Sequence, residues 1–173
     1  MIKAEIVIDF PKWKTKIRNP NLYFQRKIKK LSLINLFNKK NFHFTLLLTN
    51  KKVIKKLNKK FRKKNKSTDA LSFPYYSFKN LNSIKENNIY IGDIAICFEV
   101  INSRSKKNSF IREFDKVWIH GLLHLLGYNH IKDKDYFKMY KFEKRILCGY
   151  CFYFNFVFVI KFSIWCMSCC NCS

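Results

Sequence analysis

Glycine, proline and acidic side chains are scarce in this chain of 173 residues, which holds 4 Gly, 3 Pro and 11 Asp and Glu. So little glycine and proline excludes collagen-like sequences and proline-rich linkers. The first 146 residues hold no apolar run long enough to span a bilayer, and the N-terminus lacks the basic start and apolar run of a signal peptide. Cys97 is the only cysteine before residue 148, which fits a reducing compartment. We therefore expect a cytoplasmic protein whose body forms one domain.

What the sequence has in excess is positive charge. Lys and Arg total 35, and the formal net charge is +24 at pH 7. An A/T-rich genome would inflate the lysine count, so the total alone does not identify a partner. The clustering is more specific, because ten of the sixteen residues from Lys51 to Lys66 are basic and none is acidic. Such a block needs a solvated face or an anionic partner, for example a nucleic acid.

The hydrophobic pattern predicts an α+β fold in which helices cover a small mixed β-sheet. Strands are expected at 2–9, 42–48, 70–73 and 90–98, and helices at 22–37, 50–61, 110–126 and 133–147, with a helical stretch near Glu99 and a loop at 75–89. Asn50 is the expected N-cap of the helix at 50–61. His43 falls in a strand that looks buried, so we interpret it as a core histidine.

Three of the four histidines of the chain fall within eleven residues. His120 and His124 are four residues apart and therefore project from the same face of a helix. Gly127 can end that helix in the left-handed conformation, after which the chain can return His130 to the same point. Three imidazoles leave a zinc ion one open position, as a hydrolytic site needs. The segment predicts one Zn²⁺ per chain, held at the C-terminal end of a helix and in the following turn.

The same histidine spacing occurs in the metzincin proteases, which gives a first alternative. Those enzymes carry Glu directly after the first histidine as the general base. This chain has Gly121 there, and glycine has no side chain to accept a proton. A zinc metalloprotease built on this site would therefore need a base from another part of the chain.

Three ordered motifs resemble those of the YbeY family. The closest match is His120-Gly121-Leu122-Leu123-His124-Leu125-Leu126-Gly127-Tyr128-Asn129-His130. Two further segments are similar to family motifs, Phe61-Arg62 followed by Ser67-Thr68-Asp69-Ala70-Leu71-Ser72-Phe73-Pro74, and Tyr90-Ile91-Gly92-Asp93-Ile94-Ala95-Ile96. The last family helix resembles the segment that contains Met139, Glu143, Ile146 and Leu147. Where the family usually has Asp, this chain has Asn129, which keeps the hydrogen-bonding shape but loses the charge.

The resemblance implies a bacterial, metal-dependent, single-strand-specific endoribonuclease that acts in ribosomal RNA 3′-end maturation and ribosome quality control. It implies ribosomal RNA and the small ribosomal subunit as partners, and no small-molecule cofactor. The metal ligands it implies are His120, His124 and His130, and its catalytic arginine is Arg62, whose planar fork suits phosphate oxygens. Four nearby lysines are candidates for RNA contacts: Lys59, Lys60, Lys63 and Lys64. A non-catalytic RNA- or ribosome-binding protein that keeps the metal for folding is a second alternative.

The composition changes abruptly after Leu147. Residues 1–147 form the YbeY-like domain that we expect, and residues 148–173 form a tail rich in cysteine and aromatic residues. Six of the seven cysteines lie in this tail, at positions 148, 151, 166, 169, 170 and 172. Their spacing permits a four-cysteine zinc site, and the length and low charge from Ile146 to Met167 permit a membrane anchor. The abrupt change favours a third interpretation, a frameshifted or extended reading frame, and we expect no membrane association except through the tail.

Overall fold

The computed structural model describes residues 1–31, 40–76, 84–106 and 109–151. Its elements follow the order β1 (Ile2–Ile8), α1 (Trp13–Lys16), α2 (Pro20–Leu31), β2 (Asn41–Thr49), α3 (Lys51–Arg62), β3 (Ala70–Pro74), β4 (Asn88–Cys97), α5 (Phe98–Arg104), α6 (Phe110–Leu125) and α7 (Asp133–Cys151). The predicted α+β fold with a small mixed sheet is confirmed. The part of the predicted helix at 22–37 that follows Leu31 and the tail after Cys151 lie outside the described residues.

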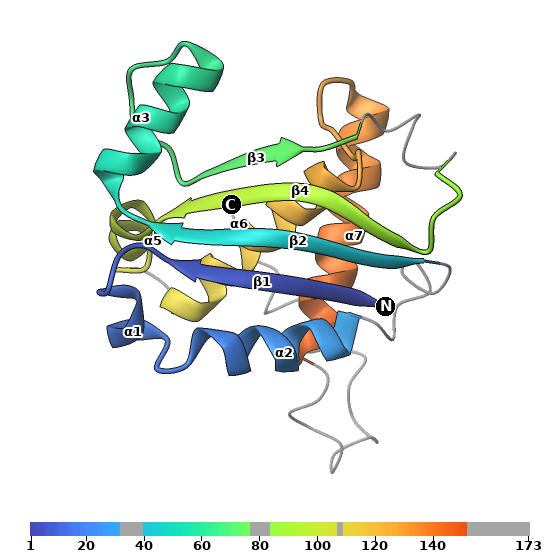
Figure 1. The fold of residues 1–173 in the computed structure, drawn as a ribbon, viewed down its shortest axis with the longest axis horizontal. Coiled ribbons are helices and arrows are strands. Elements are labelled where there is room, and N and C mark those ends of the chain that lie inside the picture. Colours follow the sequence, from blue (N-terminus) through green and yellow to red (C-terminus); the bar gives the residue numbers. More distant parts are fainter. Residues whose placement is uncertain (32–39, 77–83, 107–108, 152–173) are drawn as a thin grey trace, which may run out of the picture.

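The four strands form a mixed sheet in the order β1-β2-β4-β3 (Figure 1). Strands β1, β2 and β4 are parallel, and β3 pairs with β4 in the antiparallel direction at the edge. The pairing of β2 with β4 shifts between His43 and Phe44, because Tyr90 and Gly92 face these two residues and Ile91 is left between them. Gly92 has φ 127°, and a Cβ there would lie 2.1 Å from the carbonyl oxygen of Phe73. This glycine therefore allows β3 to approach β4 closely.

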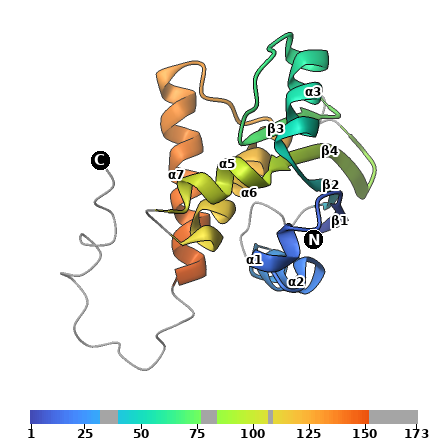
Figure 2. The ribbon, with the colours of Figure 1, turned by 90° about the vertical axis from the view of Figure 1, so that its left-hand side faces the viewer.

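Helices cover the two faces of the sheet unequally. Helix α2 runs along β1, while α6 and α7 lie behind the sheet in Figure 1 and to its left in the side view of Figure 2. The core on this side is strongly aromatic, with ring contacts, most of them edge to face, among Trp13, Phe24, Phe98, Phe114 and Trp118. Trp13 is fully buried and its indole donates to the Thr49 carbonyl oxygen at 3.1 Å, which fixes the short helix α1. The sequence pattern had not predicted that helix.

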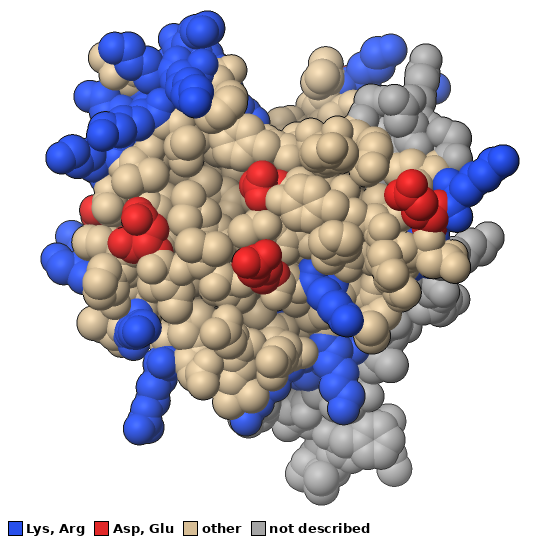
Figure 3. Space-filling view, in the orientation of Figure 1, with Lys and Arg blue, Asp and Glu red and all other residues tan. Residues whose placement is uncertain are grey.

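Helix α3 packs on the opposite face, at one end of the sheet. Its Asn50 N-cap accepts hydrogen bonds from the backbone N–H groups of Lys52 and Val53, as predicted. Ile54 is buried against Leu71 and Cys97, and the lysines of α3 point to solvent. In Figure 3 they form a dense group of basic side chains over α3.

Candidate metal centre and cleft

The end of α6 is shaped by two hydrogen bonds around Gly127. The backbone N–H of Gly127 donates to the His124 carbonyl oxygen and that of Tyr128 donates to the Leu123 carbonyl oxygen, each at 2.9 Å. Gly127 has φ 85°, so this is the Schellman arrangement that closes a helix with a left-handed residue. The turn reverses the chain directly after His124. It is the local reason why His130 can face the two histidines of the helix.

The three predicted ligand histidines converge. Their ligand nitrogens all lie within 4.8 Å of one another, and the Nε2 atoms of His120 and His124 are 3.0 Å apart. The ring of His130 lies 5.4 Å from that of His120 and 5.2 Å from that of His124, between centroids. Three imidazole nitrogens gathered around one point are the donor set of an open zinc site. The residues present therefore fit a divalent metal.

Two of these imidazoles are oriented through their other ring nitrogen. Nδ1 of His120 lies 2.5 Å from Oε1 of Glu143 on α7, and Nδ1 of His124 lies 3.0 Å from the carbonyl oxygen of Tyr128. Each contact holds the imidazole ring in place and leaves its Nε2 directed at the point where the ring nitrogens of the three histidines gather. The sequence placed Glu143 only in the pattern of the last helix. Its role depends on a contact across 23 residues, which periodicity does not reveal.

The electrostatics of the cluster favour neutral imidazole at His124. Burial lowers the pKa of His124, and the positive charges of His120, His130 and Arg62 lower it further. The Tyr128 carbonyl oxygen opposes this shift. Neutral imidazole is the form that binds a metal, so the environment keeps this ligand ready.

Arg62 and one histidine of the metal cluster, His124, line a cleft of about 490 Å³. Three tyrosines, Tyr75, Tyr76 and Tyr128, form part of its wall, and the other lining residues are Ser72, Pro74, Gly127 and Asn129. Tyr75 is 67% exposed and contacts the ring of Tyr76 edge to face, with centroids 4.9 Å apart. The sequence had assigned only a loop to these tyrosines. The cleft combines one histidine of the metal cluster, the arginine guanidinium and exposed aromatic rings.

Comparison with known proteins identifies the family. The family profile described as endoribonuclease YbeY matches residues 8–150. The chain belongs to the YbeY family. This confirms the resemblance drawn from the sequence, and with it the enzyme class at the level of the family.

Individual relatives agree with this assignment. Endoribonuclease YbeY of Pelagibacter ubique is 45% identical over 150 residues, which cover 84% of this chain and 94% of that protein. Endoribonuclease YbeY of Buchnera aphidicola subsp. Acyrthosiphon pisum is 39% identical over 129 residues, covering 73% and 77%. A solution structure of a Thermotoga maritima protein matches with a TM-score of 0.56 at 24% identity, covering 86% of this chain and 88% of that one. That structure supports the fold alone.

Gly121 of this YbeY-family chain packs against the sheet. A Cβ at this position would lie 3.0 Å from Cγ2 of Ile94 and 3.1 Å from Oγ of Ser72. Such spacing is tighter than ordinary van der Waals contact, so α6 sits on β3 and β4 because the residue lacks a side chain. A glutamate here would meet the sheet. The position that would carry the general base of a metzincin is thus used for helix packing.

The other residues predicted from the sequence lie outside the histidine cluster. The predicted RNA-contact lysines are all exposed near the end of α3, where Lys63 is the left-handed C-cap with φ 58°.

Burial raises the pKa of Asp69, but hydrogen bonds from Arg104, Ala70 and Thr68 outweigh the effect of burial and leave that pKa below its usual value.

The interpretation of His43 as a core histidine is wrong. It points to the uncovered sheet face, is exposed, and contacts the ring of Tyr90. Strand alternation explains the error, because Phe44 beside it fills the core.

Among the described residues, no helix is both long enough and apolar enough to cross a membrane. The predicted division at residue 147 stays a prediction. Helix α7 continues to Cys151, and the interpretations of the tail concern residues outside the described part of the chain.

Proposed function

We propose that this YbeY-family chain is a zinc-dependent, single-strand-specific endoribonuclease of the cytoplasm. Its proposed role is ribosomal RNA 3′-end maturation and ribosome quality control, with the small ribosomal subunit as partner. The observation that carries the proposal is the cleft that Arg62 and His124 line together. In this cleft a bound substrate could contact the guanidinium of Arg62 and the metal-binding cluster at the same time.

Each group of the cleft has a distinct task in this proposal. The three histidines bind the metal, and Glu143 orients His120. When bound, zinc supplies Lewis acidity toward the phosphate and toward water. Arg62 donates N–H bonds to the non-bridging phosphate oxygens and stabilises the charge that develops there.

The aromatic wall supports the preference for single strands. Unpaired bases can stack on exposed aromatic side chains, whereas paired bases are already stacked in a duplex. Tyr75 offers such a surface directly beside the metal cluster. Two exposed lysines that precede the cleft along α3, Lys59 and Lys60, add salt-dependent backbone contacts without sequence readout.

The test compares substrates on the zinc-loaded full chain. A single-stranded RNA with the sequence of a small-subunit rRNA 3′ end should be cut, and the same RNA annealed to its complement should resist. EDTA should abolish cleavage and added zinc should restore it. Binding of RNA without cleavage would identify a non-catalytic RNA-binding protein, and cleavage of a peptide library without cleavage of RNA would identify a protease.

A variant of Arg62 can distinguish an effect on the chemical step from an effect on RNA binding. We expect Arg62→Ala to lower kcat by about 100-fold or more while Kd for RNA changes little, because its fork acts where charge develops and many lysines share the ground-state contacts. The matched double variant Lys59→Gln/Lys60→Gln should instead raise Kd and leave kcat near its original value. Equal effects of both variants on kcat and Kd would reduce Arg62 to one more backbone contact.

A further inference from the structure

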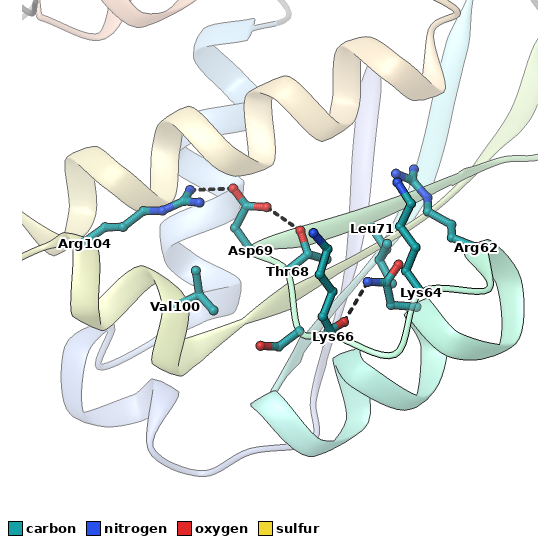
Figure 4. A pocket seen from close by; sticks show the side chains of 10 residues that line it. Arg62, Lys64, Lys66, Thr68, Asp69, Leu71, Val100 and Arg104 are labelled. Carbon is teal, nitrogen blue, oxygen red and sulfur yellow. Dashed lines mark hydrogen bonds and ion pairs between the residues drawn. The ribbon is translucent and has the colours of Figure 1, made fainter.

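A second cavity adjoins the cleft on the far side of Arg62. It has a volume of about 270 Å³ and lies between the segment that follows α3 and the end of α5 (Figure 4). Arg62, Lys64 and Lys66 line one part of it, and Arg104 approaches Asp69 from the other side. The three ligand histidines do not line this cavity. Arg62 therefore belongs to both hollows and joins them.

The cavity is strongly cationic. Among the described residues that line it, Arg62, Lys64, Lys66 and Arg104 are basic and only Asp69 is acidic, so four positive charges and one negative charge leave +3. Among the described residues, Asp69 pairs with Arg104 at 2.5 Å and no carboxylate pairs with Arg62, Lys64 or Lys66. The excess charge calls for an anion with several oxygens.

The segment that carries the two lysines is held in place. The side-chain amide of Asn58, which is 3% exposed, donates to the Lys66 carbonyl oxygen at 2.7 Å. The backbone carbonyl oxygen of Asn58 accepts hydrogen bonds from the backbone N–H groups of Lys63 and Lys64. Lys63 takes the left-handed conformation at φ 58°, which turns the chain after α3. Asn58 thus fixes Lys64 and Lys66 at the cavity instead of leaving them on a loose chain.

Arg104 is likewise prepared to bind an anion. Asp69 engages only its Nη1 atom, and Asp69 is itself held by the Thr68 hydroxyl and the Ala70 N–H at 2.9 Å each. The guanidinium carries five N–H donors, and its side chain is 52% exposed. No other acceptor in the described part of the chain contacts this guanidinium, so the remaining donors are available to a ligand. The hydroxyl groups of Ser67 and Thr68 also line the space.

We propose that this cavity binds a backbone phosphate of the RNA that is not the one cleaved. This inference rests on the proposed function. The scissile phosphate lies at the histidine cluster, a neighbouring phosphate lies between Lys64, Lys66 and Arg104, and Arg62 stands between the two. The cavity makes Lys66 and Arg104 positioning residues for substrates that extend past the cleft. A substrate with a single phosphodiester cannot reach both places at once.

The test uses two lengths of substrate and two matched variants of the zinc-loaded full chain. Lys64→Gln/Lys66→Gln removes two cavity lysines that have no ion pair among the described residues, so folding should survive. Lys55→Gln/Lys56→Gln removes two exposed lysines of α3 that do not line the cavity. Cleavage is measured with a single-stranded 12-nucleotide RNA and with a dinucleotide. Thermal unfolding confirms that each variant is folded.

We expect the cavity variant to raise KM for the 12-nucleotide RNA about 10-fold or more, with kcat within 2-fold and the dinucleotide unaffected. Its binding should also depend less on salt, with a slope smaller by about 0.7 for each single-strand phosphate that the variant no longer neutralises. Arg104→Gln should reproduce the length-dependent effect. The control variant should change KM much less.

Equal effects on both substrates, or equal effects of cavity and control variants, would overturn the proposal. Its failure differs from failure of the proposed function. If the original chain cuts no RNA, the proposed function fails. The subsite is then judged by fluorescence anisotropy with a 12-nucleotide 2′-O-methyl RNA, where the cavity variant must still bind more weakly than the control.

Discussion

Replacing Glu143 with glutamine tests whether a contact between α6 and α7 sets the metal affinity. Glu143→Gln preserves the size of the side chain and its capacity to accept a hydrogen bond from Nδ1 of His120, but it removes the negative charge. In the structure Nδ1 of His120 lies 2.5 Å from Oε1 of Glu143, and the side chains of Glu143 and His120 are 24% and 43% exposed, respectively. The change therefore affects one property of a positioning contact, and the three ligands stay in place.

The magnitude follows from the type of hydrogen bond that is weakened. A charge-assisted hydrogen bond contributes about 1.5–3 kcal/mol and a neutral one about 0.5–1.5 kcal/mol. The difference is about 1–1.5 kcal/mol. Mutation of a residue that hydrogen-bonds to a metal ligand lowers metal affinity about 10- to 100-fold, and the partial exposure of His120 favours the lower part of that range. We therefore expect the zinc Kd to rise about 10-fold, which corresponds to about 1.4 kcal/mol.

The assay is competition for zinc with a chromogenic chelator at pH 7, using the full chain. Glu5→Gln is the control, because Glu5 is an exposed glutamate on β1. Thermal unfolding of the metal-free proteins should show that both variants are folded at the assay temperature. A Kd for Glu143→Gln within 2-fold of that for Glu5→Gln would refute the orienting role. A rise beyond about 1,000-fold would mean that Glu143 is itself a ligand.

Three further predictions concern the cleft and its surroundings. Asn129→Asp should raise the cleavage rate up to about 10-fold, because a carboxylate beside the third histidine can orient it, and single-turnover kinetics measure this. Tyr75→Ala should raise Kd for single-stranded RNA about 5- to 100-fold because a base can no longer stack on the ring, and Tyr75→Phe should not. The lowered pKa of Asp69 means that its contribution to stability is present above about pH 3.9 and is lost as pH falls through the folded-state pKa. The difference in urea midpoint between the original chain and Asp69→Asn should therefore shrink below about pH 4.

The parts of the molecule that the sequence predicted correctly depend on short-range patterns. The proximity of His120 and His124 follows from helical spacing, and Gly127 indicates the turn that brings His130 to them. Most element bounds agree within a few residues for the same reason. The N-cap of α3 was likewise predicted correctly, from the single residue Asn50 that precedes the helix.

The parts that the sequence missed depend on contacts between distant segments. Glu143 and His120 are 23 residues apart, and Arg104 and Asp69 are 35 apart. Neither pair has a spacing that a helix or a strand would generate. The aromatic wall was missed because Tyr75 follows Pro74 at the end of the edge strand β3, in what looks like an ordinary loop. Its position beside the metal cluster emerges only once α6 packs on β3 through Gly121.

The charge of the chain shows most clearly why position outweighs composition. A net charge of +24 is equally compatible with codon bias and with RNA binding, and the ten basic residues from Lys51 to Lys66 do not by themselves identify the partner. The structure divides this run into two kinds of lysine. Lys55 and Lys56 face solvent from an exposed turn of α3, whereas Lys64 and Lys66 line a cavity and are fixed there by the buried Asn58. Codon bias can raise the number of lysines, but it does not by itself place two of them at a cavity. The case for RNA binding therefore rests on that cavity rather than on the total charge.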